Sequence, residues 1–201
     1  MPENIPLQYG QYYHIYNRGN NREDIFRQER NYRYFLQRFA QHICPIAVVY
    51  AYCLLGNHFH FLLRIKDAPE DLSGFPKPDR SRAPSQSFSN LFNAYTRAFN
   101  KAYGRTGALF QRPFGRIPVT SDRYFCRLVT YIHRNPEKHG FVDDFRDWPY
   151  SSYHALRSTK PTRLDRDDVL GWFEGLEGFD LAHRQDVAES RIESLVLDDF
   201  D

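Results

Sequence analysis

The sequence has no long hydrophobic run and no leader-like start. Its longest apolar stretch, around Ile46 to Leu55, is far shorter than the roughly 20 residues that a membrane-spanning helix needs. The start MPENIPLQYG lacks the basic-then-apolar order of a secretory signal peptide. We therefore expect a soluble, cytoplasmic protein with no membrane partner.

Cysteine is also scarce. Cys44, Cys53 and Cys126 are the only three, they are widely spaced, and none belongs to a Cys-x-x-Cys pair. An odd number at such spacing argues against a disulfide framework and fits a reducing compartment. We interpret all three as packing residues.

Charge is unevenly distributed, although the net charge of the 201 residues is only +2. Residues 1–140 hold 20 Lys and Arg against 10 Asp and Glu, a balance of +10, whereas residues 141–201 hold 7 against 15, a balance of −8. Of the 20 basic residues in the first part, 16 are Arg, whose planar guanidinium pairs with phosphate oxygens in a bidentate way. The first part is the candidate nucleic-acid binder, although an ordinary solvated basic surface would have the same composition.

Hydrophobic periodicity predicts an alternation of strands and helices. Apolar residues at every second position mark strands, and those at i, i+3 and i+4 mark amphipathic helices. The expected elements are a strand at 12–18, a helix at 29–43, a hairpin of strands at 46–55 and 58–65, a helix at 86–103, a strand at 109–119 and a helix from 121 to Pro136, which ends it. A long irregular loop, rich in proline, is expected at 67–84.

This order, βαββαβα, indicates an α+β fold of ferredoxin-like type, with an antiparallel sheet and helices packed on one face. A chain with 41% apolar residues can bury one core. We predict one main domain over residues 1–157 and an acidic C-terminal extension over residues 158–201, with short helical patterns at 165–174 and 181–197.

The strand at 58–65 carries the first candidate site. Because side chains alternate along a strand, His58 and His60 share one face, while Phe59 and Phe61 point to the opposite face and the core. The two imidazoles stand about 7 Å apart at the backbone, close enough to converge on one divalent ion. Two ligands do not complete a metal site.

The helix that begins at residue 121 supplies the candidates that would complete the site. Tyr131 and Asn135 are four residues apart and therefore neighbours on one helical face, at the flank of the apolar face and partly exposed. If this helix packs against the strand, Asn135 offers an oxygen to the metal and Tyr131 stands over the same ion. Such ligands suit Mg²⁺ or Mn²⁺, with imidazole favouring Mn²⁺.

Such a set of groups supports phosphodiester transfer, in which the metal polarises a phosphoryl oxygen and the Tyr131 phenolate attacks phosphorus. A free tyrosine has a pKa of about 10, so a cation is needed to favour the ionised form. The metal and Arg127 are the candidates. A phosphotyrosine link keeps the bond energy, so that the hydroxyl of a second strand rejoins without ATP.

Each of these residues also has an ordinary structural interpretation. A His-x-His pair on a strand is often surface decoration, and Tyr131 is one of 14 tyrosines, most of which are expected to pack. Asn135 directly precedes Pro136 and fits the end of a helix. Periodicity alone does not decide between these interpretations.

Four segments of the sequence resemble the single-tyrosine HUH transposases of the IS200-like group, and in particular the REP-associated tyrosine transposase branch. They are YHIYNRGNNREDIF at 13–26, CLLGNHFHFLL at 53–63, YIHRNPEKHGFV at 131–142 and WPYSSYHAL at 148–156, with GALFQRPF at 107–114 as a weaker fifth. The segments occur in the order that the family shows and span most of residues 9–157.

The resemblance implies that His58 and His60 are the metal-binding HUH pair, Tyr131 the nucleophile and Asn135 a third ligand, where the insertion-sequence branch usually has Gln. It also implies that residues 1–157 form an HUH-type catalytic domain with Mg²⁺ or Mn²⁺ as cofactor. That domain would cleave single-stranded DNA near a hairpin through a 5′-phosphotyrosine intermediate, leaving a free 3′-hydroxyl. Members of the family occur as monomers and as homodimers.

DNA contacts beyond the catalytic residues are predicted from charge alone. Exposed tyrosines could stack unpaired bases. The basic residues expected to contact DNA are Arg18, Arg22, Arg97, Lys101, Arg112, Arg116 and Arg127.

Three other functions remain open at this stage. A domesticated descendant would grip DNA hairpins without transposition, although intact His58, His60 and Tyr131 argue against lost chemistry. A metalloenzyme acting on a small substrate would use the histidine pair with a hydrolytic water and would need neither DNA nor Tyr131. A purely structural or protein-interaction module would leave the charge asymmetry unexplained.

Overall fold

The computed structural model describes residues 5–68 and 82–184. Its centre is a four-stranded antiparallel sheet with the strand order β2-β3-β1-β4. The strands are β1 Tyr12–Arg18, β2 Ala47–Leu54, β3 His58–Ile65 and β4 Gly115–Val119. The predicted α+β class and antiparallel ferredoxin-like sheet are confirmed, as is the hairpin of β2 and β3. No helix within the described ranges is long and apolar enough to cross a membrane.

The fourth strand is shorter than predicted. The pattern indicated a strand at 109–119, but β4 begins only at Gly115, and before it Phe110 makes an isolated bridge to Gly19. Pro113 has no N–H to give to a ladder, so regular pairing starts after it. Pro118 is tolerated inside β4 because this strand lies at the edge of the sheet.

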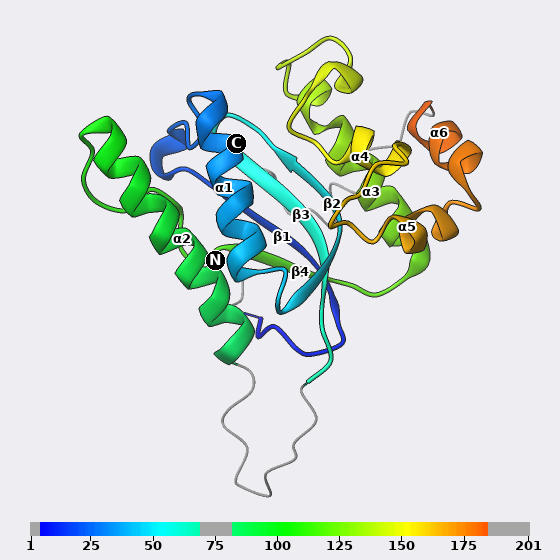
Figure 1. Ribbon diagram of the computed structural model, residues 1–201, viewed down its shortest axis with the longest axis horizontal. Helices are drawn as coiled ribbons and strands as arrows, with labels where there is room; N and C mark the ends of the chain where they lie inside the picture. Colours follow the sequence, from blue (N-terminus) through cyan, green and yellow to red (C-terminus); the bar gives the residue numbers. More distant parts are fainter. Residues whose placement is uncertain (1–4, 69–81, 185–201) are drawn as a thin grey trace, which may run out of the picture.

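Two helices cover one face of the sheet (Figure 1): α1 Glu29–His42 and α2 Arg82–Tyr103. The side chain of Gln28 caps α1 in a reciprocal arrangement with Asn31. The core beneath these helices contains Phe59 and Phe61, which confirms the predicted inward face of β3. Because α2 starts at Arg82, the end of the loop predicted at 67–84 is helical; residues 69–81 of that loop lie outside the described ranges.

The expectation of helices on only one face is wrong. Helix α3, Asp122–Lys138, packs on the opposite face together with α4 Tyr153–Arg157, α5 Arg166–Trp172 and α6 Leu176–Arg184 (Figure 1). A second core forms there, since outward residues of the strands, such as Leu62, are themselves apolar and buried against α3. The sheet is therefore covered on both sides.

Helix α3 also extends past the residue that was expected to end it. Ser121 caps its start by accepting a hydrogen bond from the Tyr124 N–H, as the sequence predicts. Pro136 lies inside the helix, which continues to Lys138. The turn containing Pro136 is closed by the N–H of His139, which donates to the Asn135 carbonyl at 3.0 Å, so the missing proline N–H does not end the helix.

Part of the predicted C-terminal extension belongs to this second core. Val169 and Phe179 are fully buried there, and Phe173 nearly so. The observed α5 and α6 only partly match the helical patterns expected at 165–174 and 181–197, and residues 185–201 lie outside the described ranges. The division at residue 157 stays a prediction.

A chain of buried hydrogen bonds joins β2, α3 and α6. Nδ1 of His183 donates to the Phe179 carbonyl at 2.7 Å, so its Nε2 accepts from Nδ1 of His133 at 2.8 Å. Nε2 of His133 then accepts from the Ser152 hydroxyl at 2.7 Å, whose oxygen in turn accepts from the Tyr52 N–H at 2.8 Å. The Ser152 hydroxyl also has the Tyr52 carbonyl within reach at 3.2 Å, and its shorter contact is the one to His133.

Candidate functional site

The two predicted histidines lie side by side in β3, on the face that α3 covers. His58 is 4% exposed and His60 is 1% exposed, and their ring centroids are 5.2 Å apart. The strand alternation predicted from the sequence is therefore confirmed. Enclosure this complete is unusual for histidines that only decorate a surface.

In both histidines Nδ1 is close to another side chain, and Nε2 faces the space between β3 and α3. Nδ1 of His60 lies 2.9 Å from Nε2 of His14, and Nε2 of His60 is buried with no hydrogen-bond partner among the described residues. Nδ1 of His58 lies 2.7 Å from Oδ1 of Asn57 and donates to it, which leaves Nε2 as an acceptor. Nε2 of His58 therefore carries a lone pair, and Nε2 of His60 carries one in the tautomer in which His60 donates to His14.

Helix α3 brings the other two predicted residues to the same place. Oδ1 of Asn135 lies 3.4 Å from Nε2 of His58, and the ring of Tyr131 stands edge-on to His60 with the centroids 5.8 Å apart. Tyr131 is 8% exposed, so it is more enclosed than the partly exposed position expected from the helical pattern. The structure therefore brings together all four residues predicted for the catalytic centre.

Burial keeps the imidazoles of the site neutral. Desolvation lowers the pKa of His58 to about 3, with a smaller contribution from His139, and it lowers the pKa of His14 to about 3. The pKa of His60 is held well below its usual value, first by burial and then by the neighbouring His14. A neutral imidazole is the form that binds a metal ion.

The fit of a divalent metal rests on this donor set. Within residues 5–68 and 82–184, no group of three or more His, Cys, Asp or Glu side chains is placed to hold a metal ion, and the third donor predicted from the sequence is the amide oxygen of Asn135. That oxygen and Nε2 of His58 face each other as two acceptors, and Nε2 of His60 has no partner among the described residues. Two imidazole nitrogens and one oxygen are compatible with Mn²⁺ or Mg²⁺.

Three residues near the site were missed by sequence reasoning. His14 bonds to His60, the ring of His139 lies 5.1 Å from that of His58, and Nζ of Lys138 lies 5.5 Å from the centroid of the Tyr131 ring. Lys138 follows Tyr131 by seven residues, or two helical turns, so spacing alone could have found it. His14 could be found only with the register of β1 and β3, in which its neighbour Tyr16 pairs with His60.

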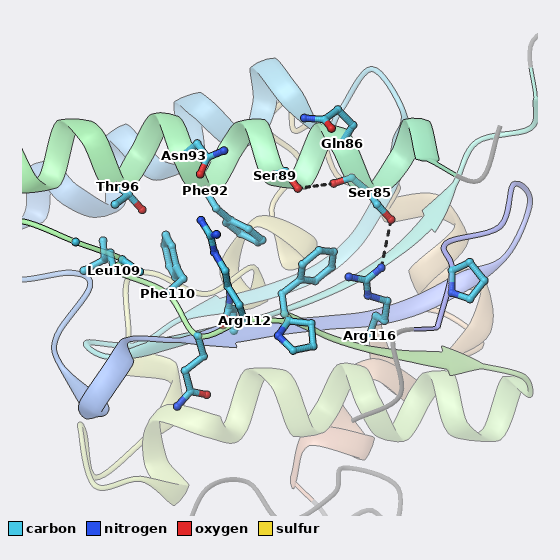
Figure 2. Close-up of a pocket in the computed structure, with 17 residues that line it drawn as sticks. Ser85, Gln86, Ser89, Phe92, Asn93, Thr96, Leu109, Phe110, Arg112 and Arg116 are labelled. Carbon is cyan, nitrogen blue, oxygen red and sulfur yellow. Dashed lines mark hydrogen bonds between the residues drawn. The ribbon is translucent and has the colours of Figure 1, made fainter. Parts of the chain in front are cut away.

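The basic residues predicted to contact DNA do not form one surface. Arg18 lies at the end of β1, paired in register with His58, on the face of the histidines. Arg112 and Arg116 line a groove on the opposite face (Figure 2). The exposed residues among the others are Arg22, Arg97 and Lys101, whereas Arg127 is half-buried on α3. Their contacts with DNA stay predictions.

Comparison with known proteins places this site in a family context. The chain is 31% identical over 107 residues to a REP-associated tyrosine transposase of Haemophilus influenzae. The aligned region covers 52% of this chain and 57% of that protein. It is 25% identical over 104 residues to the REP-associated tyrosine transposase of Escherichia coli, which covers 52% of this chain and 53% of that protein. The chain thus spans little more than half the length of these curated relatives. No family model matches the sequence.

The fold has a counterpart among solved structures. A REP-associated tyrosine transposase bound to a REP hairpin superposes with a TM-score of 0.57 and 19% identity, over 80% of this chain and 88% of that one. At this identity the likeness concerns the fold. The two curated relatives confirm the resemblance found in the sequence motifs: over about half its length the chain is similar in sequence to REP-associated tyrosine transposases.

Proposed function

We propose that the protein is a transposase-type enzyme that cleaves and rejoins single-stranded DNA beside hairpins, with Tyr131 as the covalent nucleophile and a divalent metal held by His58, His60 and Asn135. The observation that carries the proposal is the convergence of these four side chains from β3 and α3 on one enclosed place. The names of the curated relatives support a DNA-processing role.

Each side chain of the site would have a separate role in such a reaction. His58, His60 and Asn135 would hold the metal, and His14 would keep the His60 ring in place through its bond to Nδ1. Lys138, over the Tyr131 ring, places a positive charge beside an approaching phosphate. A bound Mg²⁺ or Mn²⁺ would polarise the phosphoryl oxygen under attack.

The covalent step exchanges one phosphate ester for another. The phenol of Tyr131 loses its proton to solvent, and its oxygen forms a bond to phosphorus while the bond between phosphorus and the 3′ oxygen breaks. The departing 3′ oxygen takes up a proton, so the products are a 5′-phosphotyrosine link and a free 3′-hydroxyl. The reverse step, with the 3′-hydroxyl of another strand, joins DNA without an external energy source.

The test is a denaturing-gel assay for a covalent protein–DNA adduct, with purified protein, Mn²⁺ or Mg²⁺ and labelled hairpin-bearing single strands from the flanks of its own gene. We expect an adduct that disappears with chelator and with Tyr131→Phe, because only the phenol oxygen forms the link. Tyr124→Phe is the matched control on the same helix and should keep the adduct.

Other outcomes would redirect the proposal. An adduct that persists in Tyr131→Phe would move the nucleophile to another residue. Hairpin binding without any adduct would indicate a domesticated DNA-binding protein, and the absence of both would favour a metalloenzyme that acts on a small substrate.

A further inference from the structure

A groove of about 760 Å³ lies between α2 and the segment that leads into β4, on the face of the sheet opposite to the histidines. Its volume falls within the roughly 300–1,000 Å³ that is typical of ligand sites. Along α2 its wall carries polar side chains on one helical face, among them Gln86, Ser89 and Asn93. Figure 2 shows these residues above the groove and Phe110, Arg112 and Arg116 below it, with the Arg112 side chain pointing toward α2.

The groove holds buried hydrogen-bond donors that the protein does not use. Asn17 is 4% exposed; its Oδ1 accepts from the Arg18 N–H, but its Nδ2 has no partner within residues 5–68 and 82–184. Nη1 of Arg116 donates to the Ile5 carbonyl and to the Ser85 hydroxyl, both at 3.2 Å, yet its Nε is also buried with no partner in the same part of the chain. Donors left unpaired in a buried position are costly, and a ligand that brings acceptors would satisfy them.

Aromatic rings form the apolar part of the same groove. Phe92 lies 5.1 Å from Phe110 and 5.4 Å from Phe114 between ring centroids, and the Arg116 guanidinium lies 3.9 Å from the centroid of Phe114. A guanidinium over an aromatic ring and phenylalanines that line a groove offer planar surfaces on which a base can stack. Arg112 is exposed at the rim and carries a further positive charge.

From this arrangement we infer that the groove between α2 and β4 binds an unpaired nucleobase of the DNA strand, stacking it on the aromatic and guanidinium surfaces and pairing its acceptor edge with Asn17 and Arg116. Base acceptors such as carbonyl oxygens and N7 match donors of these types. A bare phosphate would use the arginines and the amide but not the rings. The inference deepens the proposed function and rests on it, because it assigns a base-reading role to a surface away from the catalytic tyrosine.

The test measures affinity by fluorescence anisotropy with the full chain and two labelled DNA hairpins. One hairpin carries a short unpaired tail with bases, and the other carries a tail of the same length made of abasic sugar-phosphate units. We expect the wild-type protein to bind the base-bearing tail about tenfold more tightly, the size of one stacked base. Asn17→Asp, which keeps the acceptor and replaces the unpaired donor by an oxygen, should remove most of that difference.

Two further variants separate base reading from charge. Arg112→Ala should weaken binding of both hairpins, whereas Arg33→Ala, which removes an exposed arginine of α1 paired with Glu29, should leave the tenfold preference intact. Circular dichroism melting of Asn17→Asp confirms that it is folded; if it is not, Gln86→Ala and Asn93→Ala at the groove wall take its place with the same expected loss.

The outcomes are distinct from those of the adduct assay. Equal affinity of the wild-type protein for the two tails would overturn the inference while leaving the Tyr131 chemistry standing. An equal preference in wild type and groove variants would place the base elsewhere and also overturn it. A protein that binds neither hairpin and forms no adduct would refute the proposed function together with the inference.

Discussion

His14 shows how one buried side chain can define the state of another. Its Nε2 lies 2.9 Å from Nδ1 of His60, and it is fully enclosed between β1 and α3. In the tautomer in which Nε2 of His14 accepts, Nδ1 of His60 carries the proton and Nε2 of His60 presents its lone pair to the site, which is the arrangement that metal binding requires. Partners of this kind fix the orientation and tautomer of a metal-binding histidine.

Substitution of His14 should therefore weaken metal binding more than it changes the fold. We expect His14→Phe to lower the affinity for Mn²⁺ by about 10–100-fold, and His14→Gln, which keeps an accepting oxygen, to lower it less. Titration of free Mn²⁺ by electron paramagnetic resonance measures the affinity. His42→Gln, on α1 at the other face, is the control; identical affinities for His14→Phe and wild type would remove His14 from the site.

The residues of the candidate site differ in how far the sequence could predict them. Local spacing put His58 and His60 on one strand face and Tyr131 and Asn135 on one helical face, the family resemblance supplied their roles, and the structure brings the four residues together. The contribution of His14 depends on the pairing of β1 with β3, which are separated by a helix and another strand. Local periodicity carries no information about such a non-local register.

Among the elements, α6 depends on the neutral state of a buried histidine. The hydrogen bond between His183 and His133 holds α6 against α3, and burial lowers the pKa of His183 to about 4. The unfolded chain, with the ordinary histidine pKa of about 6.5, binds more protons below that pH than the folded chain does. Stability is therefore complete above about pH 6.5 and falls as the pH drops toward 4.

The contribution of His183 should amount to about 2 kcal/mol between pH 6.5 and pH 5. Urea unfolding at the two pH values measures it, and His183→Gln should lose less stability over the same interval than the wild-type protein loses. The buried histidines of the candidate site, His14, His58 and His60, contribute equally to both proteins because they do not contact His183. Equal losses in the two proteins would show that His183 does not titrate with folding.

Element boundaries were predicted less well than element types. Helix α3 runs two residues past Pro136, and β4 starts six residues later than the pattern indicated. Both differences arise at proline. The sequence shows that the proline N–H is missing, but it does not show whether neighbouring hydrogen bonds close the turn. The second helical layer was not predicted because α5 and α6 are short, and their apolar residues make sense only once α3 lies against the sheet.

At the scale of the whole molecule, the acidic residues of the tail oppose the basic residues of the first part. Residues 185–201 hold six Asp and Glu and one Arg, so removing them changes the net charge from +2 to +7. We expect a chain ending at Arg184 to bind DNA hairpins more tightly at low salt, with the difference disappearing as salt rises. Anisotropy titrations over a salt series measure this, and unchanged low-salt affinity would contradict it.

The matched control is a chain that ends at Arg157. It also removes acidic residues, but it takes away α5 and α6 with the buried Val169, Phe173 and Phe179. Its melting temperature should fall, because burial of such side chains is worth about 1.5–3 kcal/mol each. Only the chain that ends at Arg184 therefore separates the effect of charge on DNA binding from the effect of packing on stability.

Strand β1 contributes to both faces of the sheet. His14 turns toward α3 and the histidines, whereas Asn17, an odd number of positions along, turns toward the groove beside α2. The β4 edge of the sheet, beside the groove, offers a DNA strand one path between the two places. The shortest run of nucleotides between the base that is read and the phosphate that is cut would then be set by the thickness of the sheet, and substitutions that alter affinity at either end would leave that spacing unchanged.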